Sequence, residues 1–197
     1  RKLEDAELLI QKYSRNFTPI TFDVTDEKAV KESVKIVEDK LKGQYLDCLI
    51  NNAGIAVGGP SILLETKHFR HQLEVNLFGV ISVTNAYIKL LGADLNNQHS
   101  GKIINISSVS GKRAFPFVAP YSASKFALEG YSDALRRELL LYEIDVILIQ
   151  PGPIKTAIWD KTPNKDDNPF LKSDYKNSLK KFYNLVMKNG KNGLEPI

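Results

Sequence analysis

Short apolar runs alternate along the chain with longer stretches in which apolar residues recur every three or four positions. The runs are "LDCLI", "KIINI" and "DVILI", and nearly continuous apolar runs of this length are typical of strands buried on both faces of a parallel sheet. The segment "FTPITFDVTD" is rich in β-branched and aromatic residues. It predicts a further strand that ends near Asp23.

The stretches between these runs show the period of amphipathic helices. Apolar residues at helical spacing predict helices over about residues 27–41, 67–91 and 121–142, with further helical segments near both ends of the chain. Thr25 and Asp26 precede the first of these helices as cap residues, and Gly43 follows it. Strands that alternate with helices of this length predict an α/β domain whose parallel sheet carries helices on both faces.

Composition narrows the class of protein. The 197 residues are 43% hydrophobic and 25% charged, with a formal net charge of +4, as in an ordinary globular domain. The chain has no dense basic block, which argues against nucleic-acid binding, and no apolar run of about 18 residues, so no membrane span is predicted. Its one cysteine, Cys48, excludes a disulfide framework. We therefore expect a reducing, cytoplasmic location.

Small and polar residues follow the predicted strands. Because the carboxyl ends of parallel strands meet at one edge of a sheet, ligands bind there. Glycines and small residues at that edge allow the backbone to approach a nucleotide closely. The residues in question are Asp23 and Val24 after the first strand, "NNAG" after the second, Ser107, Ser108 and Ser110 after the third, and "PGP" with Thr156 after the last.

Tyr121 and Lys125 share one helical face in the motif "YSASK". An ammonium beside a phenol favours the phenolate and lowers its pKa, so the pair is able to exchange a proton with an alcohol oxygen. A hydroxyl from the preceding strand end would polarise the same oxygen. The spacing alone is common by chance, and an ordinary surface helix remains the alternative. His68 and His71 have no further ligands in their pattern, so no metal site is predicted.

Four motifs occur in a characteristic order: "NNAG", "NISS", "YSASK" and "PGPIKT". Together they resemble the short-chain dehydrogenase/reductase family, in its branch of single-domain alcohol and ketone oxidoreductases of the retinol and hydroxysteroid type. The resemblance runs from about Phe17 to about Trp159. It implies a Rossmann-type doubly wound parallel sheet in one domain over residues 1–197, and hydride transfer to or from NAD or NADP. The sequence does not indicate which of the two nucleotides is used.

The resemblance assigns four catalytic roles. Tyr121 matches the acid–base, and Lys125 matches the residue that lowers the pKa of that tyrosine and binds the nicotinamide ribose. Ser108 matches the serine that orients the substrate, with Ser107 as its structural neighbour. Asn76 matches the helix asparagine that holds a water in the proton relay. The alternative for Asn76 is a polar residue in mid-helix that faces solvent.

The same resemblance assigns the cofactor contacts. It places Asp23 and Val24 at the adenine, and Asn51, Ala53 and Gly54 beside the adenosine ribose. On the nicotinamide side it places Tyr121 and Lys125 together with Pro151, Gly152, Ile154 and Thr156.

The substrate is expected to be apolar. The segment "GKRAFPFVAP" borders the substrate in the family and is rich in apolar residues here. Ser108, Ser110, Phe115 and Trp159 are the candidate contacts, and residues 157–197 form the expected substrate-binding loop and helix. An apolar stripe that includes Phe182 either packs on the domain or covers the site. These features suggest a steroid, retinoid or fatty-acyl type of alcohol or ketone.

Other readings and further expectations follow from the resemblance. No T-G-x-x-x-G-x-G turn for the pyrophosphate occurs in the chain, so we expect the native protein to have a further β-α-β unit at its N-terminus and a further strand at its C-terminus. The two long helices predict a homodimer or homotetramer. An epimerase or dehydratase of the same family, and a non-catalytic nucleotide sensor, are the alternatives. "NNAG" with Asn76 argues against the first, and the intact Ser108, Tyr121 and Lys125 set argues against the second.

Overall fold

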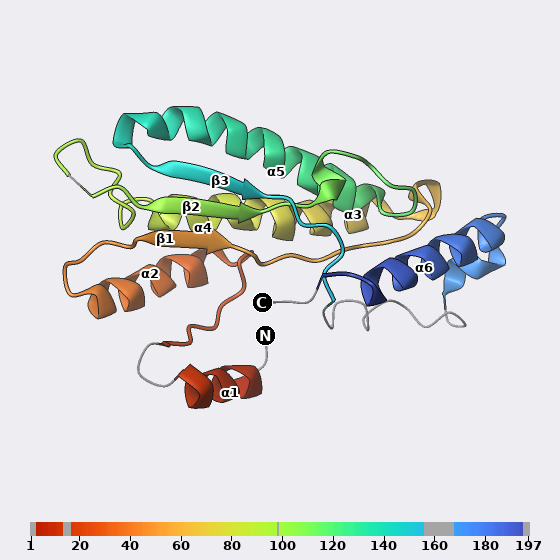
Figure 1. Cartoon of the computed structure of the whole chain (residues 1–197), viewed down its shortest axis with the longest axis horizontal. Coiled ribbons are helices and arrows are strands. Elements are labelled where there is room, and N and C mark those ends of the chain that lie inside the picture. The colour runs from red at the N-terminus through yellow and green to blue at the C-terminus, as the bar shows by residue number, and fades with distance from the viewer. Residues whose placement is uncertain (1–2, 14–16, 98, 156–167, 195–197) are drawn as a thin grey trace.

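Three parallel strands form the sheet at the centre of the computed structural model, which describes residues 3–13, 17–97, 99–155 and 168–194. The strands are β1 (Cys48–Asn51), β2 (Lys102–Ile106) and β3 (Asp145–Ile149), in the order β1-β2-β3 (Figure 1). Ile104 of β2 lies opposite Ile50 on one side and Ile147 on the other. Each strand coincides with one of the apolar runs, and the predicted parallel sheet is confirmed.

The helices also follow the apolar pattern. They are α1 (Leu3–Tyr13), α2 (Glu27–Leu41), α3 (Thr66–Leu73), α4 (Gly79–Tyr87), α5 (Ala119–Glu138) and α6 (Lys176–Lys191). The helix expected over residues 67–91 is present but not uniform. A π-helical turn, η3 (Glu74–Phe78), joins α3 to α4, and π-helical turns of this kind occur frequently at functional sites.

The ends of α2 show why this helix lies where the sequence predicts it. Asp26 is the N-cap, and its Oδ1 accepts hydrogen bonds of 3.0 Å from the backbone nitrogens of Lys28 and Ala29. Lys42 and Gly43 then adopt left-handed conformations with φ of 50° and 85°. A residue in this conformation ends a helix, and glycine adopts it without steric cost.

The prediction of a strand that ends near Asp23 is wrong. Residues 17–22 have no regular secondary structure, and among the described residues β1 pairs with β2 alone. A strand requires hydrogen-bonding neighbours, and this segment pairs with no strand. Phe22 and Val24 instead pack against a buried cluster of Val30, Val83 and Tyr87 between α2 and α4.

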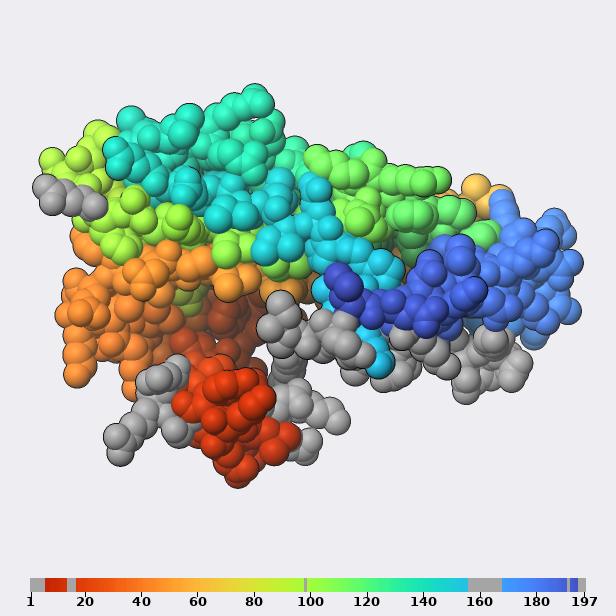
Figure 2. Space-filling view, in the orientation of Figure 1, coloured from red at the N-terminus to blue at the C-terminus, as the bar shows by residue number. Residues whose placement is uncertain are grey.

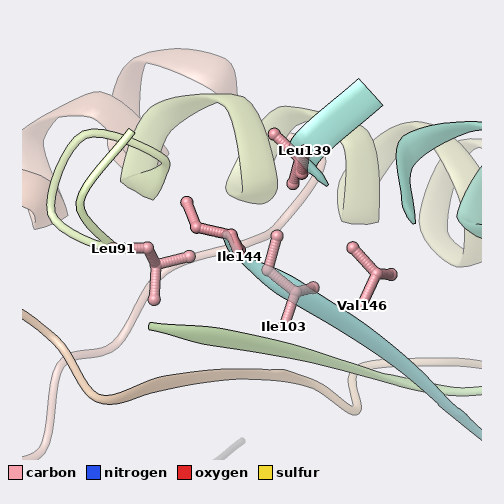
Figure 3. Packing of buried hydrophobic residues seen from close by; sticks show 5 residues of the cluster. All are labelled: Leu91, Ile103, Leu139, Ile144 and Val146. Atoms are coloured by element: carbon pink, nitrogen blue, oxygen red, sulfur yellow. The ribbon is translucent and has the colours of Figure 1, made fainter. Parts of the chain in front are cut away.

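The core lies on the face of the sheet that carries α4 and α5. Leu91, Ile103, Leu139, Ile144 and Val146 form a buried cluster there, and Figure 3 shows their side chains converging. On the opposite face the exposed fractions are 59% for Ile50, 38% for Ile147 and 45% for Ile149. The expectation that both faces of these strands are buried is therefore wrong for the part of the chain that the structure describes.

Buried polar side chains join the two helices to the sheet. Asn51 Nδ2 on β1 donates to Thr84 Oγ1 of α4 at 3.1 Å and to Asn105 Oδ1 of β2 at 2.8 Å. Asn105 Nδ2 donates in turn to Ser132 Oγ of α5 at 2.9 Å. These bonds satisfy buried amides, and they fix α4 and α5 with respect to the ends of β1 and β2.

The segment around α6 lies beyond the carboxyl ends of the strands (Figure 1). Figure 2 shows it as a blue projection beside the exit of β3. Edge-to-face contacts of Phe117 with Tyr175, at 5.9 Å, and with Phe182, at 5.5 Å between ring centroids, connect this segment to the rest of the molecule. None of the described helices is long and apolar enough to cross a membrane.

Candidate active site

The structure brings Ser108, Tyr121 and Lys125 together at the carboxyl end of β2. Ser108 follows this strand and begins the short 3-10 helix η4 (Val109–Gly111), where its Oγ accepts a hydrogen bond of 3.1 Å from the backbone nitrogen of Ser110. Tyr121 and Lys125 lie in the first two turns of α5, which has proline in its first turn. The Ser108 hydroxyl is also near enough to the Tyr121 phenol to lower its pKa.

Lys125 is a buried cation, with 7% of its surface exposed. Its Nζ donates to the Ile106 carbonyl at 2.7 Å and lies 5.7 Å from the centroid of the Tyr121 ring. Burial disfavours the charged form and lowers the pKa of Lys125 to about 8, while the negative charge of Glu129 acts in the opposite direction. The ammonium thus stands beside the phenol, as the sequence predicts.

The phenol of Tyr121 has a pKa above its ordinary value. Burial of the ring is the larger cause, and the nearby Ser108 hydroxyl lowers the pKa by less. The direction is opposite to the one expected from a neighbouring ammonium. The phenol is accordingly protonated at neutral pH.

Asn76 is 1% exposed, so the alternative of a solvent-facing residue is excluded. Its Oδ1 accepts from the Ile55 nitrogen at 2.9 Å, and its Nδ2 donates to the Ile55 oxygen at 3.0 Å and to Ser124 Oγ at 3.1 Å. Ser124 Oγ donates to the Tyr121 carbonyl at 2.7 Å. The amide therefore connects the segment after "NNAG" to the first turn of α5. Sequence analysis did not find Gln72, which holds Ile55 and Val57 in the same way from α3.

The residues expected at the adenosine lie apart from this group. Val24, Asn51 and Ala53 line one groove beside β1. The first residue of α4, Gly79, lies close to Val24: a Cβ on this glycine would be only 2.7 Å from Val24 Cγ2. The Asp23 carboxylate is exposed and accepts from the nitrogen and hydroxyl of Thr25. These two hydrogen bonds lower the pKa of Asp23. The amide nitrogen of Asn51 donates to Asn105 of β2 and Thr84 of α4.

The residues expected nearer the nicotinamide are small and accessible. Gly152 is exposed, and a Cβ on it would meet nothing within 4 Å. Gly54, expected beside the adenosine ribose, is also exposed. Ile154 forms a parallel bridge with Leu194. Thr156 and Trp159 lie outside the described residues.

These observations test whether the residues fit a nicotinamide nucleotide. Open backbone at Gly152, after β3, allows close approach of a ribose and a flat ring, and the Lys125 ammonium lies 5.7 Å from the Tyr121 ring centroid at the end of the adjacent β2. The groove at Val24 suits an adenine. The chain has no glycine-rich turn of the expected pattern for the pyrophosphate, so the fit concerns the two ends of such a nucleotide.

On the expected substrate side, Ser110 is buried and Phe115 is 37% exposed. Phe117, which sequence reasoning missed, has a φ of 63°, and its carbonyl accepts from the Gly59 nitrogen at 2.8 Å. A bulky residue in this conformation is strained. The sequence carries no signal for it. Among the described residues no group of three or more His, Cys, Asp or Glu side chains is arranged to hold a metal.

Comparison with known proteins identifies the family. The profile described as "short chain dehydrogenase" matches residues 1–167. The chain belongs to this family, and the resemblance drawn from its motifs is confirmed.

Curated relatives and solved structures agree. The chain is 42% identical over 175 residues to an NADPH-dependent 3-dehydrocapnine reductase of Ornithobacterium rhinotracheale, covering 89% of this chain and 62% of that protein. It is 35% identical over 177 residues to a 3-ketodihydrosphingosine reductase of Bacteroides thetaiotaomicron, covering 90% and 63%. The structure of an NAD+-bound xylitol dehydrogenase superposes with a TM-score of 0.73 at 26% identity, over 88% of this chain and 64% of that one. The chain thus spans less than two thirds of the length of these relatives.

Proposed function

We propose that this protein transfers a hydride between NAD or NADP and a secondary alcohol or ketone. The observation that carries the proposal is the convergence of Ser108, Tyr121 and Lys125, in which the serine hydroxyl is near enough to the phenol to lower its pKa and the ammonium lies 5.7 Å from the ring centroid. Family membership and the relatives named as reductases support it.

In the direction of reduction, Tyr121 gives its proton to the carbonyl oxygen of the substrate. Ser108 donates a hydrogen bond to the same oxygen and so orients the carbonyl. The bound nicotinamide supplies the hydride. A phenol whose pKa is raised by burial is protonated at neutral pH, so Tyr121 carries the proton that reduction of a ketone consumes.

Lys125 and Asn76 support this proton transfer. The Lys125 ammonium stabilises the phenolate that remains on Tyr121, and it holds the nicotinamide ribose. Asn76 fixes the backbone around Ile55 against the first turn of α5, and we propose that it holds a water of the proton relay. Removing the ammonium would leave the negative charge of the phenolate buried and unpaired.

In this proposal the residues at the carboxyl ends of the strands would hold the nucleotide. Asp23 and Val24 would hold its adenine, and Asn51, Ala53 and Gly54 would lie beside the adenosine ribose. Pro151, Gly152, Ile154 and Thr156 would hold the nicotinamide side. The relatives give no single preference, since one is named NADPH-dependent and another binds NAD+.

The proposed substrate is apolar. The aromatic cluster of Phe117, Tyr175 and Phe182 lies where α6 meets the loop after η4, and Ser110, Phe115 and Trp159 are the further contacts we propose. The relatives named for 3-dehydrocapnine and 3-ketodihydrosphingosine support a ketone as the group that reacts.

We also propose that copies of the protein associate through the helical layer. Two exposed aromatic side chains there support this association: Phe78 is 51% exposed and Phe126 is 46% exposed.

Replacement of Tyr121 tests the mechanism. Tyr121→Phe removes the proton donor and keeps the ring, so turnover should fall by about 10²–10⁴-fold while nucleotide affinity, measured by fluorescence titration, stays within about twofold of the parent protein. Tyr131→Phe is the matched control, because the Tyr131 hydroxyl lies on the same helix and is buried without a hydrogen-bond partner among the described residues. Turnover by Tyr121→Phe equal to that of this control would refute the mechanism.

A further inference from the structure

A buried acid lies one helical turn beyond Lys125 and takes no part in the steps above. Glu129 follows Lys125 at i+4 on α5, and its side chain is 9% exposed. Its Oε2 accepts a hydrogen bond of 2.7 Å from Gln150 Nε2 and lies 2.9 Å from Lys112 Nζ. A buried carboxylate persists only with partners of this kind, so the contacts hold Glu129 in one place.

The two partners belong to segments that carry the rest of the site. Lys112 follows the η4 turn that begins at Ser108. Gln150 follows β3 and directly precedes Pro151 and Gly152. One carboxylate oxygen therefore connects α5 with the turn of the serine and with the exit of β3.

The η4 turn also touches the helix through Gly111. A Cβ there would lie 3.0 Å from Glu129 Cγ and 3.1 Å from the Lys125 carbonyl, distances at which neighbouring groups must move. The glycine thus lets the turn lie directly against α5 at the level of these two residues. The backbone of the Ser108 turn and the β3 exit is joined as well, since Val109 N donates to the Pro151 carbonyl at 3.2 Å.

Two cations lie near Glu129 in the described part of the chain. Lys112 Nζ, beside the η4 turn, lies 2.9 Å from Glu129 Oε2, and Lys125 precedes Glu129 by one turn on the same helix, where Glu129 acts on its pKa. Gln150 and Ser107 are neutral. The Ser107 hydroxyl and Glu129 Oε1 are both buried and have no well-formed hydrogen bond, although the hydroxyl is near enough to lower the pKa of the Glu129 carboxyl. From the π-helical turn, the neutral Asn76 donates a hydrogen bond to Ser124 of α5.

We propose that Glu129 is a positioning residue of the active site: its carboxylate fixes the Ser108 turn and the β3 exit on α5, and its charge favours the ammonium form of Lys125. The sequence offers one signal for it, since Glu129 continues the face of Tyr121 and Lys125 at the same spacing of four residues. This inference rests on the proposed function only where it concerns turnover.

Two substitutions of Glu129 separate the effect of its hydrogen bonds from the effect of its negative charge. Glu129→Gln keeps an oxygen that accepts from both Gln150 and Lys112 but removes the negative charge. Glu129→Ala removes both. Glu138→Gln is the control, because Glu138 lies on the same helix and is exposed.

The first readout does not depend on catalysis. An NMR titration with ¹⁵N-labelled lysine follows the Lys125 ammonium, which is assigned from the signal missing in Lys125→Met. In Glu129→Gln we expect the midpoint to fall by at least about half a pH unit, equivalent to about 0.7 kcal/mol of lost attraction. In Glu138→Gln the midpoint should not move. If the midpoint is unchanged in Glu129→Gln, the charge of Glu129 does not favour the ammonium form of Lys125, and that part of the proposal is overturned.

The second readout is ketone reduction as a function of pH. Near pH 6.5, Glu129→Gln should keep kcat/KM within about threefold of the parent, with its alkaline limb moved to lower pH, whereas Glu129→Ala should lose at least about tenfold. Equal activity of the alanine variant and the parent overturns the positioning role. If the alanine variant does not fold, the glutamine variant alone tests the positioning role. A loss of more than tenfold in its kcat/KM near pH 6.5 would show that the hydrogen bonds of Glu129 do not support activity without its charge, and would overturn the proposal that they do. Failure of the proposed function would give a different result from failure of this inference, because Tyr121→Phe would then be as active as the parent.

Discussion

Lys125 gives a prediction about stability that does not require the substrate. Burial lowers the pKa of this side chain from 10.5 to about 8. At about 1.4 kcal/mol per pH unit, this difference corresponds to about 3 kcal/mol of stability that the folded protein lacks while the lysine is charged. Because Lys125 is 7% exposed, solvent screening reduces this figure little. The ammonium that the chemistry needs is thus a destabilising group.

The pH dependence follows from the sign of the shift. Below pH 8 the lysine is protonated in both states, so the whole penalty is present. Between pH 8 and 10.5 the unfolded chain binds more protons than the folded protein, so the free energy of unfolding rises with pH. Above that window both states are neutral and the penalty is absent.

Lys125→Met removes the charge and keeps most of the length of the side chain. The substitution also removes the hydrogen bond to the Ile106 carbonyl, which costs about 1 kcal/mol. We therefore expect the variant to be about 2 kcal/mol more stable than the parent near pH 7 and inactive. By the upper end of the window its advantage should be lost.

Urea unfolding followed by circular dichroism at pH 7, 8.5 and 10 measures this difference. Lys180→Met, at an exposed lysine of α6, is the control and should give the same difference from the parent at every pH. If the difference in unfolding free energy between Lys125→Met and the parent does not change from pH 7 to pH 10, the pKa of Lys125 is not lowered in the folded protein, and the predicted penalty does not exist.

Two further substitutions test the packing around the site. Gly111→Ala would place a Cβ 2.8 Å from Ser107 Oγ, so we expect the Ser108 turn to move and kcat/KM to fall by about tenfold or more; Gly130→Ala on α5, where a Cβ meets nothing within 4 Å, should keep its activity and gain up to about 1 kcal/mol of stability. Asn105→Leu would leave the buried amide of Asn51 and hydroxyl of Ser132 short of partners, and should cost about 2 kcal/mol or more in urea unfolding; a variant as stable as the parent would contradict the role of these bonds.

The sequence predicts the parts of this fold that depend on local pattern. The apolar runs indicate β1, β2 and β3, and the period of apolar residues indicates the helices, because a short continuous apolar run is typical of a strand and a period of three to four residues of an amphipathic helix. The cap at Asp26 follows from the same local chemistry. Ser108, Tyr121 and Lys125 were found from motifs whose order along the chain reflects the order of the strand ends.

The rest depends on interactions between distant residues. "FTPITFDVTD" has the composition of a strand, but composition does not provide a pairing partner. The exposure of Ile50 depends on which elements cover that face of the sheet. Likewise, the direction of the Tyr121 pKa shift depends on how deeply the ring is buried, which the sequence does not indicate. Glu129 acquires its contacts from residues 17 positions before and 21 after it.

The buried pair of Asn51 and Asn105 has a consequence for strand alignment. The three strands read "CLIN", "KIINI" and "DVILI", and such similar apolar sequences would pair almost equally well in several registers. The two asparagines stand opposite each other in the observed register, where Asn51 donates to Asn105. A slip of one residue would turn one of them to the other face, and a slip of two would set Asn105 against Leu49 without a partner. The amide pair therefore selects one alignment from several, and with it the height at which Ser108 emerges from the sheet.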